Sequence, residues 1–451
     1  MVAGLQDTRE YVLLDRVREK VLIGGEDMIV RNLKSFFFLL SRVRHSSDGR
    51  VLITNFCSLS ALQIIGYVFP LITLPYISRV VGIEHFGEIA FATAVIAYFQ
   101  AVVDWGFNFT ATRDVARIKS DKAEVSRIYS EVFWARVFLC AISLAVLCIL
   151  ILLIPRFREI SCLLCCRFLI VIGYVLYGDW LFQAIEKMKY ITILNIVANT
   201  LFTISVFIFI TEKEDYIYQP LLSSLGFVIS GLIAFFVLVP AEGVRLKFVT
   251  SKNVFIALKT SSAVFINQAM PVISENLTVI LLGFWGGAVA NGKFDAGYKV
   301  IGVLERFILM LSRTFFPFLA RRIDKHLFFF RLNLISAVFV TILAFVFAPF
   351  IIRILFSKEF YDAVLALRII SIAVVFSMLI NVYGINYLLL QGYEKRLRNM
   401  TVMASVAGIV FAVPLLYYFS WVGAALTLVL TRAILGICVT VEAVRIQRKT
   451  A

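Results

Sequence analysis

Long apolar runs recur along the chain, and short polar connections separate them. From Val51 onward this pattern predicts twelve helical segments, each long enough to cross a hydrocarbon core about 30 Å thick. Their ranges are 52–77, 87–107, 132–154, 162–184, 190–210, 217–239, 260–283, 294–318, 329–352, 363–389, 398–419 and 421–443. The chain is therefore predicted to be an all-α polytopic membrane protein.

Composition supports this prediction. Hydrophobic residues make up 61% of the chain, above the half that is usual in soluble domains, and the mean hydropathy is +0.91. Secreted and nucleic-acid-binding classes are excluded on the same ground, so no nucleic acid partner is expected. The net charge of +15 then needs an explanation in terms of the membrane.

The distribution of basic residues explains the net charge, because they are concentrated in alternate connections. Clusters of Lys and Arg occupy 113–127, 245–259, 321–331 and 395–398, whereas the intervening connections carry few cations. By the positive-inside rule, the basic connections and both termini are predicted to be cytoplasmic.

The chain also repeats itself at a distance of six spans. Gln183–Lys187 ends the fourth span as Gln391–Lys395 ends the tenth, and Gly87–Ala90 opens the second span as Gly292–Asp295 opens the eighth. Six is an even number, so the two halves have the same orientation. This pattern indicates two parallel-repeat six-helix lobes around a central cavity, as in transporters that hold substrate near the membrane midplane.

The predicted domains follow from the repeat. The first lobe is 51–240, a cytoplasmic linker is 241–258, the second lobe is 259–444, and a cytoplasmic tail is 445–451. Residues 1–50 contain an apolar run that is too short to span. They are predicted to be a cytoplasmic tail with an amphipathic surface helix, or else a misassigned start upstream of Met28.

A stripe of cations in the eighth span is the first candidate for chemistry. Lys299, Arg306 and Arg313 recur every seventh residue, which returns a helix to within about 20° of the same face. Ionisable residues inside a membrane normally face a bundle interior or an aqueous cavity, so the stripe suggests a route for an anion. The alternative is that Lys299 and Arg313 snorkel toward the two interfaces, which leaves only Arg306 to explain.

Other charges also fall within the predicted spans. The cations are Arg136, Arg167, Arg368 and Arg432, and the acids are Asp104, Asp179, Glu275 and Glu305. Arg136 and Arg368 lie near span ends, where snorkelling is the simplest interpretation. With the stripe included, the embedded charge is net positive.

No pattern of catalytic residues stands out. Gly287-x4-Gly292-Lys293 has the spacing of a phosphate-binding loop, but Phe294 replaces the expected Ser or Thr and no strand precedes it. We interpret it as a chance match, so no nucleotide partner is expected. The Cys162-x-x-Cys165-Cys166 cluster has no nearby histidine, which argues against a metal site. The outer connections are too short for a glycan polymerase or ligase.

Several motifs resemble one family. The stretch Trp180–Asn195 looks like the fourth-helix signature of bacterial O-antigen and polysaccharide flippases. Similar matches are Leu71–Pro75 with Arg79, Phe86-Gly87, Asp104–Phe107, Ala111–Arg113, Leu367–Ile370 and Gly392–Lys395. The resemblance covers residue 50 to the C-terminus and implies the multidrug/oligosaccharidyl-lipid/polysaccharide exporter superfamily.

That family is expected to flip undecaprenyl-diphosphate-linked oligosaccharide to the outer leaflet of the bacterial inner membrane. It implies no cofactor, a proton or sodium gradient as the driving force, and a polysaccharide polymerase and chain-length regulator as partners. Thr278, Tyr298 and Arg432 stand where the family often has acids. The remaining candidates for ion coupling are Glu275, Asp179 and Glu305.

The residues and the resemblance converge on an anionic glycolipid. The diphosphate needs cations, and the guanidinium fork of Arg fits phosphate oxygens. The candidates are Lys299, Arg306, Arg313, Arg167 and Arg432. Amides that would line a wettable sugar cavity are Asn267, Gln268, Asn276, Asn381 and Asn386, unless they merely join neighbouring helices. An ion-coupled multidrug exporter, which wants a net negative cavity, is the alternative function.

Overall fold

The computed structural model describes residues 47–118, 121–321 and 326–450; side chains within 47–68 and 310–321, and at 70, 263, 267, 307, 308, 449 and 450, are not described. Two compact units are distinguished, Met1–Ala61 and Leu62–Ala451. In the first unit, residues 47–61 are helical. All that follows concerns the second unit.

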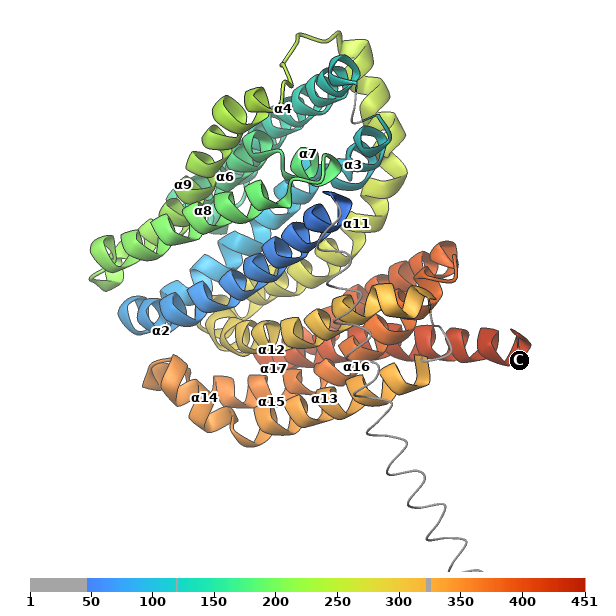
Figure 1. Ribbon diagram of the computed structural model, residues 1–451. Coiled ribbons are helices and arrows are strands. Elements are labelled where there is room, and N and C mark those ends of the chain that lie inside the picture. Colours follow the sequence, from blue (N-terminus) through green and yellow to red (C-terminus); the bar gives the residue numbers. More distant parts are fainter. Residues whose placement is uncertain (1–46, 119–120, 322–325, 451) are drawn as a thin grey trace, which may run out of the picture. The chain divides into compact units, whose positions relative to one another are not determined.

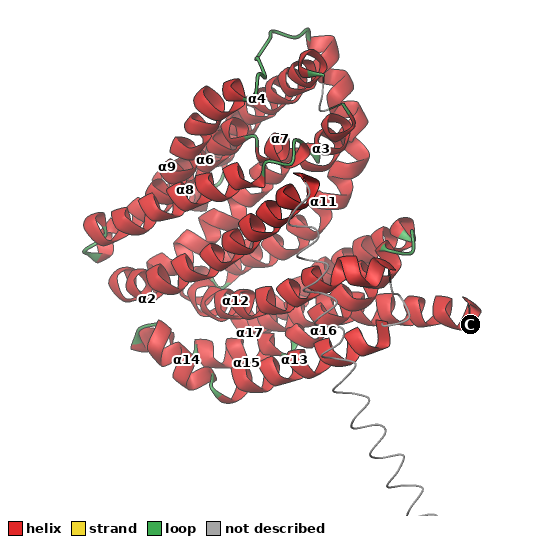
Figure 2. Ribbon diagram, viewed as in Figure 1, coloured by secondary structure: helices red, strands yellow, loops and turns green. Residues whose placement is uncertain are grey.

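Most of the described residues are helical, short loops join the helices, and no strand occurs among them (Figures 1 and 2). The first half comprises α2 (Ser47–Asp104), α3 (Phe107–Arg117), α4 (Lys122–Leu153), α5 (Pro155–Glu159), α6 (Ser161–Tyr177), α7 (Asp179–Ala184), α8 (Met188–Phe209), η1 (Lys213–Ile217), α9 (Tyr218–Ile233), η2 (Ala234–Leu238) and α10 (Val239–Ala241). The second half comprises α11 (Ser251–Trp285), α12 (Gly287–Arg321), α13 (His326–Val346), α14 (Ala348–Leu355), η4 (Lys358–Phe360), α15 (Ala363–Ser371), α16 (Ala373–Leu379), η5 (Ile380–Leu389) and α17 (Glu394–Thr450).

Two described helices, of 58 and 57 residues, are much longer than the roughly 20 residues that a bilayer requires, and each contains a break. α2 is interrupted at Gly82, where φ is 73°, and α17 is interrupted at Ser420, where φ is 49°. Both breaks lie in predicted connections, between 52–77 and 87–107 and between 398–419 and 421–443. Each long helix therefore covers two of the predicted segments.

Nine helices of the described chain are long and apolar enough to cross a membrane. Two of these, Leu71–Arg117 and Glu394–Arg448, are the long elements that contain the breaks. The predicted eighth span, 294–318, lies within α12 but is not one of the nine. The expectation of an all-helical polytopic membrane protein is confirmed, whereas the number of twelve spans stays a prediction.

The helix ends have local causes. Asp121 caps α4, because its Oδ1 accepts hydrogen bonds from the backbone N–H groups of Ala123 and Glu124 at 3.0 and 3.1 Å. Gly178 separates α6 from α7 with a left-handed φ of 55°, a conformation that glycine adopts without steric cost. These turns keep α4, α6, α8 and α9 side by side (Figure 1).

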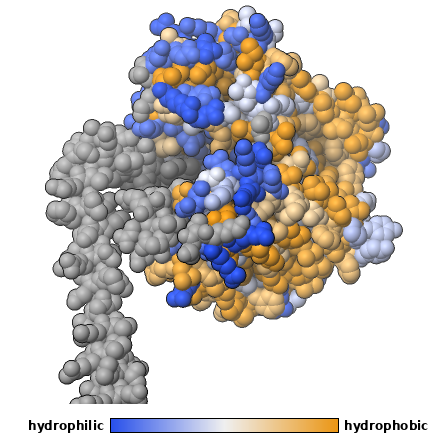
Figure 3. Space-filling model, turned by 90° about the vertical axis from the view of Figure 1, so that its right-hand side faces the viewer, coloured by the Kyte–Doolittle hydropathy of each residue, from blue (hydrophilic) through white to orange (hydrophobic). Residues whose placement is uncertain are grey.

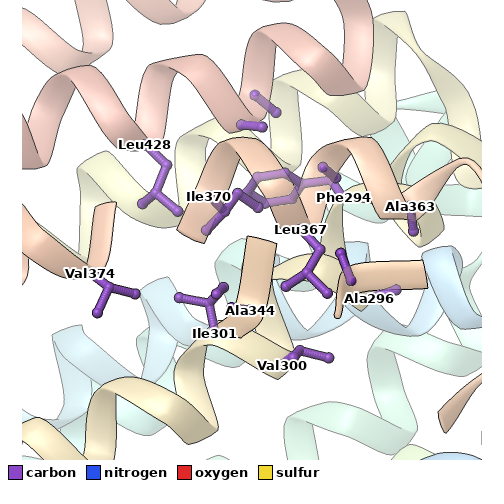
Figure 4. Close-up of a cluster of buried hydrophobic side chains, with 14 of the residues drawn as sticks. Phe294, Ala296, Val300, Ile301, Ala344, Ala363, Leu367, Ile370, Val374 and Leu428 are labelled. Carbon is purple, nitrogen blue, oxygen red and sulfur yellow. The ribbon is translucent and has the colours of Figure 1, made fainter. Parts of the chain in front are cut away.

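Three apolar cores hold the helices together. Two of them are formed mainly by first-half residues, one within 89–175 and one within 107–244. The third extends through α12–α17 and also takes in the first part of α2, from Ile77 to Phe86. Figure 4 shows part of this core, where Phe294, Leu367 and Ile370 lie close together. The first part of α2 thus packs with second-half helices, whereas its later part packs with the first half.

The outer surface is apolar over wide areas. On α13, Ile335 and Phe339 are 69% and 63% exposed, and on α4 Leu153 is 72% exposed. On the face shown in Figure 3, hydrophobic residues form a broad area and hydrophilic residues gather in separate patches. A soluble protein rarely exposes so much contiguous apolar surface, but lipid-facing helices require it.

Candidate functional site

A cavity of about 840 Å³ lies among α2, α8, α9, α12, α14, α16, η5 and α17. Its apolar lining comes largely from α2 and α12, with further residues from α8 and α14, and includes Leu74, Phe202 and Leu355. Its polar lining comprises Thr73, Asn199, Gln219, Tyr298, Lys299, Glu305, Arg306, Ser377, Asn381 and Arg432. Among the described residues, the charged side chains of the cavity wall come from α12 and α17, which are second-half helices.

Arg432 is the centre of an ion-pair network at the cavity wall. Its Nη1 donates to Glu305 and, at 3.1 Å, to the hydroxyl of Ser377. Ser377 donates in turn to Glu305 at 2.8 Å, and Nη2 of Arg432 lies 3.8 Å from a carboxylate oxygen of Glu275. The cation predicted to bind diphosphate is thus already neutralised by two carboxylates in this state.

A second, smaller space lies beside the main cavity and is lined by Glu275. A pocket of about 70 Å³ is lined by Glu275 together with the polar side chains of Ser274, Asn276, Thr278, Thr427 and Thr431. Tyr298 and Arg432 line both spaces, and the Tyr298 hydroxyl lies 3.5 Å from Glu275. Two of the three predicted coupling acids, Glu275 and Glu305, therefore meet at one arginine.

The structure describes two of the three side chains of the cation stripe. Lys299 and Arg306 both line the cavity, whereas the side chain of Arg313 lies outside the described residues. Nζ of Lys299 lies 2.5 Å from a carboxylate oxygen of Asp295, one turn earlier on α12, and 4.1 Å from the ring centroid of Phe86. The side chain of Lys299 thus reaches back toward the start of α12, and both interpretations of this residue, anion contact and snorkelling, stay predictions.

Arg167 and Asp179 are not part of this cavity. Arg167, on α6, donates to the hydroxyl of Ser223 on α9 at 2.8 Å. Asp179 opens α7 and is not a lining residue of the cavity. The structure therefore does not place either residue beside the second-half cluster.

Arg136 does not snorkel, which corrects the interpretation made from its position near a span end. It is only 2% exposed and donates to Asp104 at 2.7 Å and to Asn108 at 2.9 Å. Burying a guanidinium is tolerated here because a carboxylate on α2 compensates its charge.

The predicted sugar-binding amides are divided. Asn381 lines the main cavity and Asn276 the smaller pocket, whereas Asn386 is fully buried and donates to the Asn381 carbonyl at 2.9 Å. Gln268 is exposed on α11 outside both spaces, and the side chain of Asn267 is not described. For Asn386 the interpretation as an internal helix contact therefore fits better than a cavity role.

Sequence reasoning missed two amides that do line the cavity, Asn199 on α8 and Gln219 on α9. Asn199 also donates to the Asn195 carbonyl at 2.8 Å. A polar residue within an otherwise apolar span was the available signal, but no embedded cation drew attention to these helices. Asp295 was also missed, although its i,i+4 spacing to Lys299 predicts the observed ion pair.

The net charge of the cavity depends on whether the acids paired with its lining residues are counted. The cavity lining itself has Lys299, Arg306 and Arg432 against Glu305. The paired acids Asp295 and Glu275 then balance the remaining two cations.

The described residues contain no group of three or more His, Cys, Asp or Glu side chains that could hold a metal ion.

Fold and cavity together define a polytopic helical membrane protein with an internal, charged cavity of substrate size, the arrangement of a secondary transporter. The chain belongs to the family described as polysaccharide biosynthesis protein, whose profile matches residues 52–323. The resemblance inferred from the motifs is thereby confirmed.

Curated relatives agree with the family. A putative O-antigen transporter of Escherichia coli (strain K12) is 28% identical over 393 residues, covering 84% of this chain and 94% of the relative. A putative O-antigen transporter of Shigella dysenteriae is 26% identical over 382 residues, covering 82% and 94%. Both relatives are named as transporters.

Solved structures show the same fold. The inward-facing conformation of a multidrug resistance MATE family transporter of the MOP superfamily has a TM-score of 0.62 at 15% identity, covering 88% of this chain and all of that one. The lipid II flippase MurJ in an inward closed conformation has a TM-score of 0.59 at 12% identity, covering 86% and 87%.

The family signature itself lies away from the cavity. Trp180 is 2% exposed in a first-half core and lies 6.1 Å from the ring of Tyr129. Lys187 donates to Glu242 on the connection after α10 at 2.5 Å. These residues stabilise the turn between α7 and α8, so the motif identifies the fold rather than the substrate site.

Proposed function

We propose that this protein is a flippase that carries an undecaprenyl-diphosphate-linked oligosaccharide from the cytoplasmic to the outer leaflet of the bacterial inner membrane. Membership of the polysaccharide biosynthesis family and the relatives named as O-antigen transporters support this proposal. Transport proceeds by alternating access of two six-helix lobes, the parallel repeats recognised in the sequence.

The observation that carries the proposal is the composition of the cavity wall. Arg306, Lys299 and Arg432 supply cations from second-half helices, and Asn199 and Gln219 supply amides from first-half helices. A diphosphate has at least two negative charges and is bound best by charge-assisted hydrogen bonds, whereas sugar hydroxyls need neutral donors and acceptors. The apolar lining of α2 suits the first units of a polyprenyl chain.

In the proposed mechanism, Arg432 exchanges its carboxylate partners for the diphosphate of the substrate. In the described state it is held by Glu305 and lies near Glu275. An incoming diphosphate competes for the same guanidinium, and the two carboxylates then lose their counter-charge inside the membrane. A carboxylate inside the membrane without a cation favours uptake of a proton or sodium ion, which couples substrate binding to the ion gradient without any cofactor.

The proposed orientation places both termini and the 240–259 connection in the cytoplasm, because of the distribution of basic residues. On the outer side, the released glycolipid becomes the substrate of a polysaccharide polymerase, whose products a chain-length regulator sorts. These proteins are the proposed functional partners.

A transport assay tests the function directly. Purified protein is reconstituted in liposomes with a fluorescent undecaprenyl-diphosphate oligosaccharide, and a membrane-impermeant quencher reports how much lies in the outer leaflet. We expect redistribution between leaflets with the glycan chemically unchanged. Absence of movement under every ion gradient would contradict the proposal, and an elongated glycan would indicate a polymerase or ligase.

Ion-coupled export of cationic drugs is the alternative function. One observation favours it, since Arg432 with Glu275 and Glu305 forms a cluster with one more negative than positive charge. The same liposomes loaded with a cationic fluorescent dye separate the two functions. Dye extrusion without glycolipid movement would replace the flippase proposal.

A further inference from the structure

Two segments with the same glycine spacing lie in the two halves of the chain. Gly82-x4-Gly87 interrupts α2, and Gly287-x4-Gly292 opens α12 exactly 205 residues later. The first glycine of each segment has a left-handed backbone, with φ of 73° at Gly82 and 77° at Gly287. The segment discounted as a phosphate loop is thus the structural repeat of the kink in α2.

The two segments pack against each other through their glycines. A Cβ atom on Gly87 would lie 1.8 Å from the carbonyl oxygen of Ala288, and one on Gly292 would lie 2.4 Å from the carbonyl oxygen of Ile83. Each carbonyl belongs to the residue one turn before the partner glycine. The contact is therefore reciprocal, as in a twofold interface, and no side chain fits at either position. We name residues 82–87 and 287–292 together the glycine crossing.

Each glycine segment of the crossing is followed by a residue that forms an ion pair within its own half. The residue after Gly87 is Glu88, which lies 3.6 Å from Arg156. The residue after Gly292 is Lys293, which lies 2.6 Å from Asp362. The two pairs occupy corresponding places in the repeat with reversed polarity, so each glycine segment has one ion pair within its own half.

Beside the crossing, aromatic contacts and hydrogen bonds join α2 to the second half. The ring centroid of Phe86 lies 6.0 Å from that of Phe356 and 5.3 Å from that of Phe360. The backbone N–H of Ile83 donates to Glu359 of η4 at 3.2 Å, and the Ser78 hydroxyl donates to the Leu355 carbonyl at 3.1 Å. Arg79 also donates to the Ile354 carbonyl. These bonds connect α2 with the α14–η4 turn and can break without disturbing the ion pairs within either half.

The crossing bounds one end of the cavity. The cavity-lining residues of α2 end at Ile77, about one turn before Gly82, and those of α12 begin at Tyr298, less than two turns after Gly292. Lys299 joins the two places, because it is a lining residue of the cavity and its ammonium lies 4.1 Å from the ring centroid of Phe86 in the crossing.

We propose that the glycine crossing is the outer gate of the cavity, a seal that is closed in this state and parts when the halves rock. The inference rests on the proposed transport function for its purpose, although the seal itself is a property of the fold. The ion pairs hold each glycine segment to its own half, so opening has to break the hydrogen bonds between α2 and the α14–η4 turn and the contacts of Phe86 with Phe356 and Phe360. Withdrawal of Lys299 toward a bound anion loosens its contact with Phe86 and so favours opening.

Accessibility of the cavity tests the gate without any substrate. A cysteine-free chain receives one cysteine at the cavity wall, Asn381→Cys, and a membrane-impermeant thiol reagent is added to spheroplasts or to inside-out vesicles. In the parent chain we expect slow labelling from outside and fast labelling from inside. Gly87→Ala and Gly292→Ala, which place a methyl group against backbone, should speed labelling from outside. Gly302→Ala is the matched control, because a Cβ there meets no atom within 4 Å.

A second variant, without a steric clash, tests the gate if the glycine variants misfold. Glu359→Ala removes the bond to Ile83 without a steric clash and should raise outside labelling about fivefold, the shift expected from one hydrogen bond. The neighbouring exposed Lys358→Ala should not. Unchanged outside labelling in folded Gly87→Ala and Gly292→Ala, or in Glu359→Ala if the glycine variants do not fold, would overturn the proposal. A protein that flips no glycolipid but shows these labelling changes would instead refute the function alone.

Discussion

At the scale of single residues, Arg432 and Arg306 occupy the same cavity but differ in their surroundings. Arg432 is 14% exposed and held by Glu305, whereas Arg306 is exposed to the cavity. Buried pairs cost much to break and exposed cations cost little to remove, so the two arginines should respond differently to truncation.

Arg306 is expected to serve the substrate. Arg306→Ala should abolish flipping while the yield of monodisperse detergent-extracted protein stays close to that of the parent. Arg306→Lys should recover part of the rate, because one ammonium cannot reproduce a two-pronged phosphate contact. The liposome assay and size-exclusion chromatography are run on the same preparations. Equal loss of folded protein and of flipping would assign Arg306 a structural role.

Arg432 is expected to serve stability as well. Arg432→Ala leaves Glu305 without its cation and should lower the free energy of unfolding by about 3–5 kcal/mol, the usual cost of breaking a buried pair. Thermal midpoints followed by tryptophan fluorescence in detergent measure the loss. The double variant Arg432→Ala with Glu305→Gln should regain much of it. No recovery would mean that Glu305 is not the carboxylate left uncompensated.

Glu275 is the residue on which ion coupling is expected to depend. Its side chain is 46% exposed and borders the small polar pocket, so Glu275→Gln should change stability little. Flipping should lose its dependence on pH or sodium, because a neutral amide cannot exchange a proton or balance a bound cation. Transport rates across a range of pH and sodium test this expectation. A variant with the pH and sodium response of the parent would show that the coupling acid lies elsewhere.

At the scale of helices, the sequence predicted what depends on local periodicity. The breaks at Gly82 and Ser420 fall in predicted connections because apolar runs and turn residues mark them directly. The Arg432–Glu305 pair joins residues 127 positions apart, and no periodicity reports such a contact. For the same reason Asn199 and Gln219 escaped notice, and Asn386 was assigned a cavity role that its burial contradicts.

The turn between α7 and α8 provides a prediction at this scale. Lys187 and Glu242 are paired at 2.5 Å, and the Glu242 side chain is 7% exposed. Lys187→Met and Glu242→Gln should each lower the thermal midpoint, and the double variant should lose less than the sum. We expect a coupling of about 0.5–3 kcal/mol from the double-mutant cycle. Additive losses would show that the ion pair does not stabilise the turn.

At the scale of the whole molecule, orientation in the membrane is the property on which the direction of transport depends. The basic connections predict that 240–259 is cytoplasmic and that the connection between α8 and α9 is outside. Asn291, in the predicted outer loop before the eighth span, is fully buried and therefore unsuitable for surface labelling. Glu214 and Lys252 are exposed and lie on opposite predicted sides.

Single-cysteine labelling at these two positions tests the orientation. In spheroplasts, a membrane-impermeant thiol reagent should modify Glu214→Cys and leave Lys252→Cys unmodified, because only the first faces the reagent. In inside-out vesicles the pattern should reverse, and full labelling of both in detergent confirms that each thiol is reactive. If Lys252→Cys were labelled in spheroplasts instead, the cytoplasmic assignment would be wrong. The glycine crossing would then close the cytoplasmic end of the cavity, and the direction of transport would have to be reassigned with it.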